Sequence, residues 1–159
     1  MSNKFEQYKL INAQVQALIS GESDTVANMA NIAAVLFNNL EQINWAGFYL
    51  YKEKQLVLGP FQGQPACIRI PMGKGVCGTS AATKQTLIVK DVHEFEGHIA
   101  CDAASNSEIV VPILVNDELF GVLDIDSPVT ARFDDDDKLG LELLVKTFSE
   151  ATNLTVTQQ

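Results

Sequence analysis

The sequence is poor in positive charge and has no long apolar run. Its 159 residues include 11 Lys and Arg against 20 Asp and Glu, a formal net charge of -9. Nucleic-acid binding requires a basic surface, so this composition argues against a DNA or RNA partner. No segment approaches the roughly 18 consecutive apolar residues that a membrane span needs, and residues 1–10 do not resemble a signal peptide. The composition therefore predicts one cytoplasmic domain that does not enter a membrane.

Cysteine is scarce, and the cysteines do not form tight pairs. The chain has three, at Cys67, Cys77 and Cys101, and two histidines, His93 and His98. Structural zinc sites use closely spaced pairs such as Cys-x2-4-Cys, which this sequence lacks, so we expect no structural metal. An odd number of cysteines without an export signal indicates reduced thiols, and any disulfide is expected to be transient. The cysteines therefore point to thiol chemistry.

Cys77 lies in the glycine-bounded phrase 73–79, near the expected start of a helix. The phrase lacks both the P-loop pattern and the dinucleotide-binding fingerprint, so no nucleotide cofactor is expected. A helix N-terminus and the neighbouring Lys74 would both favour a thiolate at Cys77, whereas Cys101 is followed by the acidic Asp102. The local residues alone thus nominate Cys77 as the more activated thiol.

The apolar pattern predicts an α+β domain with an antiparallel sheet flanked by helices. On the helices it places Leu18, Val26 and Leu139 among the inward-facing residues. The segment 90–106, which contains both histidines and Cys101, has no clear period and is expected to be functional. Residues 153–159 should fray. The predicted helices span 5–19, 25–41, 75–82 and 134–152, and the predicted strands span 43–51, 56–59, 67–70, 87–89, 108–115 and 119–126.

Three acidic residues interrupt apolar strands. Glu108 begins one predicted strand, and Asp124 and Asp126 share a face of another because side chains alternate along a strand. Neighbouring carboxylates repel, so at least one should hold a proton or a cationic partner. A solvent-facing strand pattern explains the acids equally well. Trp45, the only tryptophan, is either a core residue or a ligand contact. By contrast, the acidic run 134–137 is explained by the helix dipole, without a metal.

Five phrases together resemble one protein family. They are GPFQGQPAC at 59–67, GKGVCGT at 73–79, GHIACD at 97–102, SEIVVP at 107–112 and GVLDID at 121–126. In combination they are similar to the free methionine-(R)-sulfoxide reductases, which are single GAF domains. The resemblance covers nearly the whole chain and includes the spacing of all three cysteines. It implies one GAF domain over residues 1–159, with two N-terminal helices, a sheet and a C-terminal helix.

The resemblance also implies a reaction and a role for each cysteine. The family reduces the R epimer of free methionine sulfoxide to methionine. Cys101 resembles the catalytic cysteine, which is oxidised to a sulfenic acid, while Cys67 and Cys77 resemble the cysteines that resolve it as a disulfide. Which of the two resolves first is left open. Thioredoxin is the implied reductant, and no cofactor is implied. In this respect the resemblance overrules the local argument for Cys77.

The remaining site residues follow the same resemblance. Glu108 or Asp126 is the implied proton donor, and Asp124 or its neighbours would bind the ammonium of the free amino acid. Trp45 matches the aromatic residue that packs on the substrate methyl group. Glu96 departs from the family pattern, where proline is expected. The alternatives are a non-catalytic GAF domain that binds a small ligand and a redox-sensing GAF domain, and a homodimer through the terminal helices is a further expectation.

Overall fold

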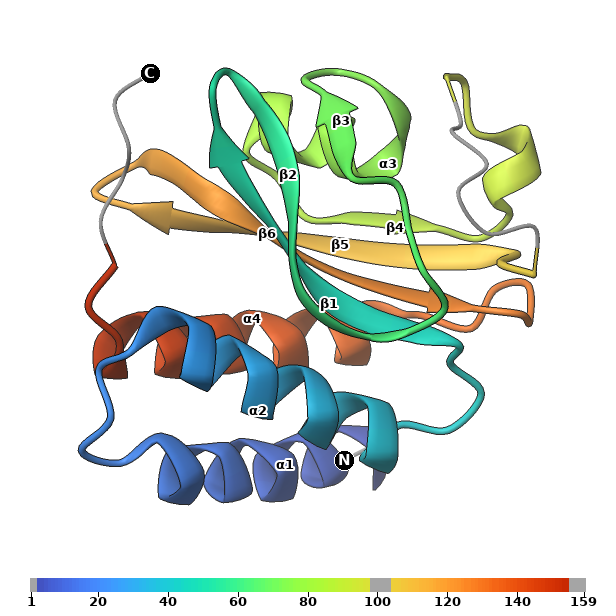
Figure 1. The fold of residues 1–159 in the computed structure, drawn as a ribbon. Helices are drawn as coiled ribbons and strands as arrows, with labels where there is room; N and C mark the ends of the chain where they lie inside the picture. The colour runs from blue at the N-terminus through green and yellow to red at the C-terminus, as the bar shows by residue number, and fades with distance from the viewer. Residues whose placement is uncertain (1–2, 98–103, 155–159) are drawn as a thin grey trace.

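The structure is a computed structural model that describes residues 3–97 and 104–154. Two helices precede a sheet whose strands are interrupted by a third helix, and a fourth helix closes the chain (Figure 1). In chain order the elements are α1 (Asn3–Ile19), α2 (Thr25–Asn39), β1 (Trp45–Lys52), β2 (Gln55–Gly63), β3 (Arg69–Pro71), α3 (Gly75–Thr83), β4 (Leu87–Val89), the 3-10 helix η1 (Val92–Glu94), β5 (Ser107–Val115), β6 (Glu118–Ser127) and α4 (Asp135–Ala151).

The six strands of the described residues form one antiparallel sheet in the order β3-β2-β1-β6-β5-β4. Two tight hairpins join β1 to β2 and β5 to β6. Glu53 and Lys54 between β1 and β2, and Asn116 and Asp117 between β5 and β6, all have positive φ. This backbone matches the twist of paired strands in two-residue hairpin loops. Both hairpins were predicted from the sequence and are confirmed.

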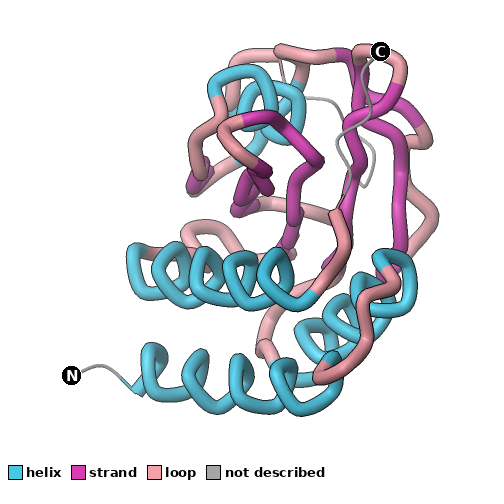
Figure 2. Tube along the Cα trace, turned by 90° about the vertical axis from the view of Figure 1, so that its left-hand side faces the viewer, coloured by secondary structure: helices cyan, strands magenta, loops and turns pink. Residues whose placement is uncertain are grey.

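Helices α1, α2 and α4 lie on one side of the sheet, and α3 lies on the other (Figures 1 and 2). α2 and α4 pack directly on the strands, while α1 forms an outer layer beneath them. The larger core cluster fills the space between this side of the sheet and the helices, and includes Phe48 of β1 and Phe148 of α4 with ring centroids 5.6 Å apart. The antiparallel α+β architecture predicted from the sequence is confirmed.

A second, smaller apolar cluster lies on the opposite side of the sheet, under α3. Strand β1 contributes to both clusters because its side chains alternate: Phe48 faces the helical layer, and its neighbours Trp45 and Tyr49 belong to the α3 side. Cys77 of α3 packs into this second cluster. The sheet therefore has a purely structural face and a face that is available for a site.

The structure corrects several details of the predicted elements. β2 extends to Gly63, β3 begins only at Arg69, α2 ends at Asn39, and η1 lies within the segment predicted to be irregular. Tertiary packing sets these ends, which local sequence pattern determines poorly.

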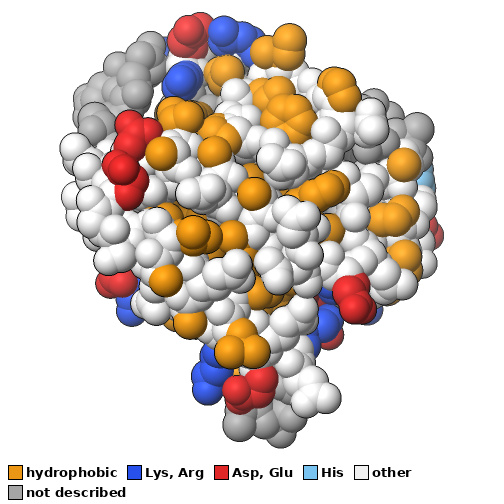
Figure 3. All heavy atoms as spheres, turned by 60° about the horizontal axis from the view of Figure 1, so that its bottom comes forward, with side chains coloured by type: hydrophobic (Ala, Val, Ile, Leu, Met, Phe, Trp, Pro, Cys, Tyr) orange, Lys and Arg blue, Asp and Glu red, His pale blue; other side chains and the backbone are white. Residues whose placement is uncertain are grey.

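Three apolar helical residues predicted to face inward are exposed instead. Leu18 is 48% exposed, Val26 61% and Leu139 54%. Each lies at the margin of its apolar stripe, while Ile19 and Leu141 nearby are buried. On the helix-covered side shown in Figure 3, exposed apolar side chains are scattered among polar ones. Scattered exposure of this kind is ordinary for a folded protein surface.

None of the helices in 3–97 and 104–154 is both long and apolar enough to cross a bilayer.

The acidic start of α4 is a structural device, as predicted from the helix dipole. Asp134 caps the helix by accepting from the backbone N–H groups of residues 136 and 137, and Asp137 accepts from the Asp134 N–H at 2.8 Å. Asp137 is fully buried, and its carboxylate also accepts from Tyr8 Oη at 2.6 Å, Lys4 Nζ at 2.9 Å and Arg132 Nη1 at 3.4 Å. One carboxylate thus joins α1, α4 and the segment before α4.

We predict that Asp137→Ala strongly destabilises the fold. Removing this carboxylate takes the acceptor from the buried Tyr8 hydroxyl and from Arg132 Nη1, and leaves Lys4 with Asp134 alone. Breaking a buried ionic network of this kind typically lowers the free energy of unfolding by about 3 kcal/mol or more. Urea denaturation measures the loss. Asp135→Ala is the matched control, because Asp135 is exposed in the same helical turn and its removal should change stability by about 0.5 kcal/mol or less. Equal effects of the two variants would contradict this role for Asp137.

Candidate active site

A pocket lies between the α3 side of the sheet and the N-terminal end of α3. Strands β1, β5 and β6 supply its floor, α3 supplies one wall, and the loop between β2 and β3 supplies another. The pocket combines an aromatic wall, a group of carboxylates and one thiol. Its lining residues are Trp45, Tyr49, Pro65, Ala66, Ile70, Lys74, Gly75, Val76, Cys77, Ser105, Glu108, Asp124 and Asp126.

The aromatic wall is held rigidly. Trp45 stacks on Phe61 with ring centroids 5.1 Å apart, and its indole Nε1 donates to the Gln64 carbonyl at 3.1 Å. Tyr49 lies four residues further along β1 on the same strand face, and its hydroxyl donates to the Cys67 carbonyl at 2.8 Å. Trp45 is therefore both buried and part of the pocket lining. The sequence left open whether it is a core residue or a ligand contact, and its position is compatible with both. Tyr49 was missed, although strand alternation from Trp45 could have identified it.

Strand register brings the three predicted carboxylates together. Glu108 on β5 is directly opposite Asp126 on β6. Asp124 precedes Asp126 by two residues and therefore lies on the same face of β6. Asp124 is only 5% exposed, so a solvent-facing strand pattern is wrong for this residue. Glu108 and Asp126 are partly buried and line the pocket. The predicted sharing of one face by Asp124 and Asp126 is confirmed.

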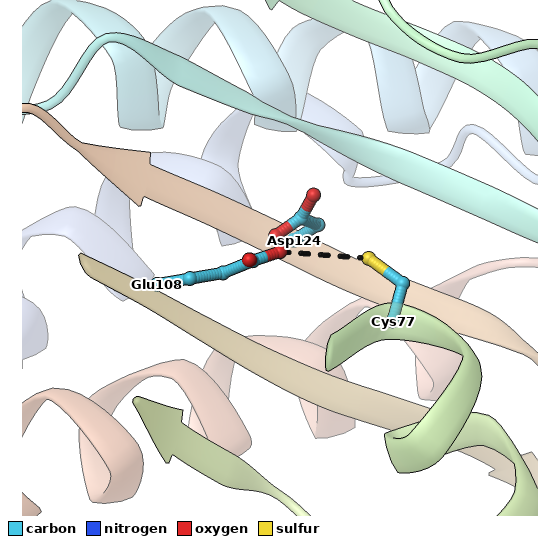
Figure 4. A group of neighbouring side chains, drawn as sticks. All are labelled: Cys77, Glu108 and Asp124. Carbon is cyan, nitrogen blue, oxygen red and sulfur yellow. Dashed lines mark hydrogen bonds between the residues drawn. The ribbon is translucent and has the colours of Figure 1, made fainter. Parts of the chain in front are cut away.

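Cys77 approaches the carboxylates from above the sheet. It lies in the first turn of α3, is buried, and donates from Sγ to Glu108 Oε2 at 3.7 Å (Figure 4). The nearest ligand-capable atoms of Cys77, Glu108 and Asp124 all lie within 4.8 Å of one another. These three side chains, here called the thiol–carboxylate cluster, come from three different elements. Their spacing is short enough for one cation to contact all three.

The structure overturns the prediction that Cys77 is an activated thiol. Cys77 does lie at the start of α3, beside Lys74. However, burial raises the pKa of the Cys77 thiol well above its ordinary value, and the negative charges of Asp124 and Glu108 raise it further. Desolvation and two neighbouring carboxylates outweigh a single helix terminus and one lysine. Cys77 is therefore a protonated thiol in this pocket and a poor nucleophile.

The same environment favours a protonated Glu108. Burial raises the pKa of the Glu108 carboxyl well above its ordinary value, and the charges of Asp124 and Asp126 add to the shift. Burial also raises the pKa of Asp124, but hydrogen bonds from Glu108, Cys77 and Asp126 oppose that shift. A carboxyl that keeps its proton near neutral pH can act as a general acid. Of the predicted acids, Glu108 therefore has an environment suited to a carboxyl that keeps its proton.

The other predicted thiol residues lie beside the pocket or outside the described chain. Cys67, in the loop between β2 and β3, is partly buried and disulfide-bonded, whereas Cys77 is a free thiol. Cys101 and His98 lie outside the described residues. Both ends of the gap adjoin the pocket: the Gly97 carbonyl accepts from the N–H of Gly75 at 3.0 Å, and Ser105 is a lining residue.

Neither His93 nor Glu96 takes part in the pocket. His93 is exposed, and its ring Nε2 is 3.0 Å from Asn106 Oδ1. Glu96, the departure from the family pattern, is also exposed. Neither residue belongs to the pocket lining. Their positions are consistent with ordinary polar residues of the segment that precedes the gap.

Comparison with known proteins gives a consistent result. The GAF domain family model matches residues 22–156. A free methionine-R-sulfoxide reductase of Escherichia coli is 56% identical over 90% of this chain and 87% of its own length. The fRMsr structure of Staphylococcus aureus in complex with substrate is 54% identical with a TM-score of 0.87, and covers 91% of this chain and 94% of its own.

A further solved structure extends the match. Free methionine-R-sulfoxide reductase from Neisseria meningitidis, in complex with its substrate, superimposes with a TM-score of 0.90 at 44% identity. The match covers 95% of this chain and 91% of that one. Identity at this level over nearly the full length, together with the shared fold and the acidic pocket, shows that this chain belongs to the GAF-domain family of free methionine-R-sulfoxide reductases.

Proposed function

We propose that this chain reduces free L-methionine-(R)-sulfoxide to methionine by a thiol mechanism. The observation that carries the proposal is the partly buried Glu108 carboxyl, whose pKa is raised by burial and by Asp124 and Asp126 on the floor of an aromatic-walled pocket. Reduction of a sulfoxide requires protonation of the departing oxygen, and this pocket supplies an acid for that step. The relatives named above are reductases of this substrate class, which supports the same assignment here.

The proposed nucleophile is Cys101. Cys77 is an unfavourable choice because burial and two carboxylates hold its thiol in the protonated form. The segment that contains Cys101 begins after Gly97, which is bonded to Gly75 of the pocket wall, and ends before Ser105 of the lining. The described residues Gly97 and Ser105 on either side of it adjoin the pocket, and the match of the Cys101 sequence to the family motif supports the role.

The proposed reaction balances in three steps. The Cys101 thiolate attacks the sulfoxide sulfur while Glu108 protonates the oxygen; methionine leaves, and Cys101 gains the oxygen as a sulfenic acid. A second cysteine thiol then condenses with the sulfenic acid, which forms a disulfide and releases water. Finally, thioredoxin reduces the disulfide by thiol–disulfide exchange and becomes oxidised itself.

Cys67 is the better supported resolving cysteine. It is disulfide-bonded in the structure, whereas Cys77 is a free thiol packed against Glu108. The Cys67 carbonyl also accepts from the Tyr49 hydroxyl, which ties its loop to the aromatic wall. Resolution by Cys67 leaves Cys77 in contact with the proton donor. In this proposal Cys67 is the first resolving thiol, and Cys77 is not required for that step.

The pocket also suggests how the amino acid is held. Asp124 and Asp126 place negative charge where the substrate ammonium would bind, and the rings of Trp45 and Tyr49 offer an apolar surface for the methyl group. Three expectations stay predictions: that residues 1–159 form one GAF domain, that the chain forms a homodimer, and that it works in the cytoplasm. The rival readings, a non-catalytic ligand-binding or redox-sensing domain, are distinguished by turnover.

The proposed function predicts catalytic turnover. Reduced protein incubated with free methionine-R-sulfoxide, thioredoxin, thioredoxin reductase and NADPH should oxidise many equivalents of NADPH per chain. The S epimer is the matched control and should support little consumption. If the R epimer yields no more than one equivalent, the enzyme assignment fails and a sensing role becomes the better explanation.

The cysteine roles predict different first-turnover yields. Without reductant, Cys101→Ser should release no methionine, because the nucleophile is missing. Cys67→Ser should release about one equivalent but fail to turn over with thioredoxin, since the sulfenic acid is formed and not resolved. Cys77→Ser should retain multiple turnovers at a lower rate. Rapid quench and quantification of methionine measure all three, and a single-turnover limit in Cys77→Ser would instead make Cys77 the first resolving thiol.

The pH dependence of the first turnover tests the proton donor. Because the acid must be protonated, the rate should fall as pH rises through the elevated pKa of Glu108. Glu108→Gln should lower the rate by about 10²- to 10⁴-fold and remove this alkaline limb. The titratable groups that interact with Glu108 include Asp124, Asp126, Cys77 and Tyr49, so each of them can shift the pH at which this alkaline limb lies.

The control for this experiment is Glu118→Gln, which removes an exposed glutamate at the start of β6 and should leave both rate and pH profile unchanged. An unaltered alkaline limb in Glu108→Gln would assign the proton donor to another group, with Asp126 the next candidate.

A further inference from the structure

We propose that the thiol–carboxylate cluster of Cys77, Glu108 and Asp124 is also a binding site for a divalent cation of the zinc class, which closes the pocket to substrate. This cation is an inhibitory ligand and no part of the proposed reaction. Metal binding itself is independent of the proposed function, whereas the inhibition rests on it.

The first argument is the spacing of the ligand atoms. A tetrahedral zinc ion with Zn–S of about 2.3 Å and Zn–O of about 2.1 Å holds sulfur and oxygen about 3.6 Å apart. Cys77 Sγ and Glu108 Oε2 are 3.7 Å apart, and a ligand atom of Asp124 lies within 4.8 Å of both. Two ligands are therefore already at the required separation, and the third needs only a small side-chain adjustment.

The second argument is an unsatisfied buried oxygen. Asp124 is 5% exposed, and its Oδ1 has no hydrogen-bond partner within residues 3–97 and 104–154. A buried carboxylate oxygen without a donor or cation is unfavourable, because it has lost its hydration without compensation. Its neighbours in the cluster offer a thiol and a second carboxyl. A cation bound by the Asp124 carboxylate would compensate for this lost hydration.

The third argument is the local charge. Across the described parts of the chain, the ion pairs join Lys4, Lys9, Arg69 or Arg132 to acids outside the cluster. Zinc is bound by a thiolate and by carboxylates, so binding displaces any proton on Cys77 or Glu108 to solvent, and the charge of the ion then offsets the repulsion among these groups.

The ligand set selects the kind of metal. One thiolate with two carboxylates suits zinc and similar transition metals, whereas magnesium and calcium prefer oxygen ligands alone. Three protein ligands also leave a coordination position open toward the pocket for water. Once bound, the metal would be coordinated by the Glu108 carboxylate, which would then carry no proton to donate to a substrate. Substrate and zinc should therefore compete.

The experiment isolates Cys77 as the one thiol of the chain. In the Cys67→Ser/Cys101→Ser double variant, the other two cysteines cannot bind metal. We expect this protein to take one Zn²⁺ per chain from a chromogenic indicator. With Co²⁺ as a spectroscopic probe, it should show a thiolate-to-cobalt charge-transfer band. Failure to bind Zn²⁺, or a cobalt complex without that band, would overturn the proposal.

Variants on the same background assign the ligands. Cys77→Ser and Glu108→Gln should each weaken Zn²⁺ affinity by about 100-fold or more, since removal of even an outer partner of a metal site commonly weakens it by about 10- to 100-fold. The control Glu118→Gln, at an exposed site, should bind as the background does. Unchanged affinity in both cluster variants would refute the site. Near-ultraviolet circular dichroism checks folding; should Cys77→Ser unfold, Glu108→Gln and the cobalt band decide.

Competition between Zn²⁺ and substrate tests whether the metal site overlaps the proposed substrate pocket, and it does so separately from the test of metal binding itself. Free methionine-R-sulfoxide should weaken Zn²⁺ binding to the double variant, which retains the pocket acids. In the wild-type chain, Zn²⁺ should inhibit turnover, and a chelator should restore it. Zinc binding in a protein that shows no reductase turnover would contradict the proposed function but support the metal site. Turnover without zinc binding would contradict the metal site but support the proposed function.

Discussion

The site depends on the register of one strand pair. Because β5 and β6 pair with Glu108 opposite Asp126, the acids share the α3 side, while Ile109 and Ile125 face the helical core. A slip of one residue would exchange these faces and bury the acids among apolar side chains. The tight hairpin at Asn116 and Asp117 and the register shift after Ile113 fix this pairing. The chemistry of the pocket is therefore a consequence of a turn far from it.

The two sides of the sheet divide stability and function between them. On the α3 side, burial and the repulsion between neighbouring acids raise the pKa values of Glu108 and Cys77, an arrangement that is unfavourable for folding. On the other side, α1, α2 and α4 bury the larger apolar cluster, and Asp137 joins the start of α4 to α1 through satisfied hydrogen bonds. The stability gained in the helical layer thus offsets the unfavourable free energy of placing acids together in the pocket.

Local pattern in the sequence predicted the elements but not the state of the thiol. Alternation placed Asp124 and Asp126 on one face, and the family motifs identified Trp45 as a site residue. Cys77 was misjudged because its acidic neighbours lie 31 and 47 residues further along the chain, at Glu108 and Asp124, on other elements. Exposure of Leu139 was missed for a related reason: periodicity defines a stripe, and only packing decides where that stripe ends.

Charge also orders the roles of the acids in the proposed reaction. A substrate ammonium lowers the pKa of any carboxyl that it contacts, so an acid that binds it cannot also remain the proton donor. Glu108, whose pKa is raised by burial and by both aspartates, keeps its proton only if the ammonium is held elsewhere. Asp124 and Asp126 on β6 provide that place, one strand away. Binding there would neutralise part of the charge that raises the pKa of Glu108, and so make its proton easier to release as the sulfoxide oxygen departs.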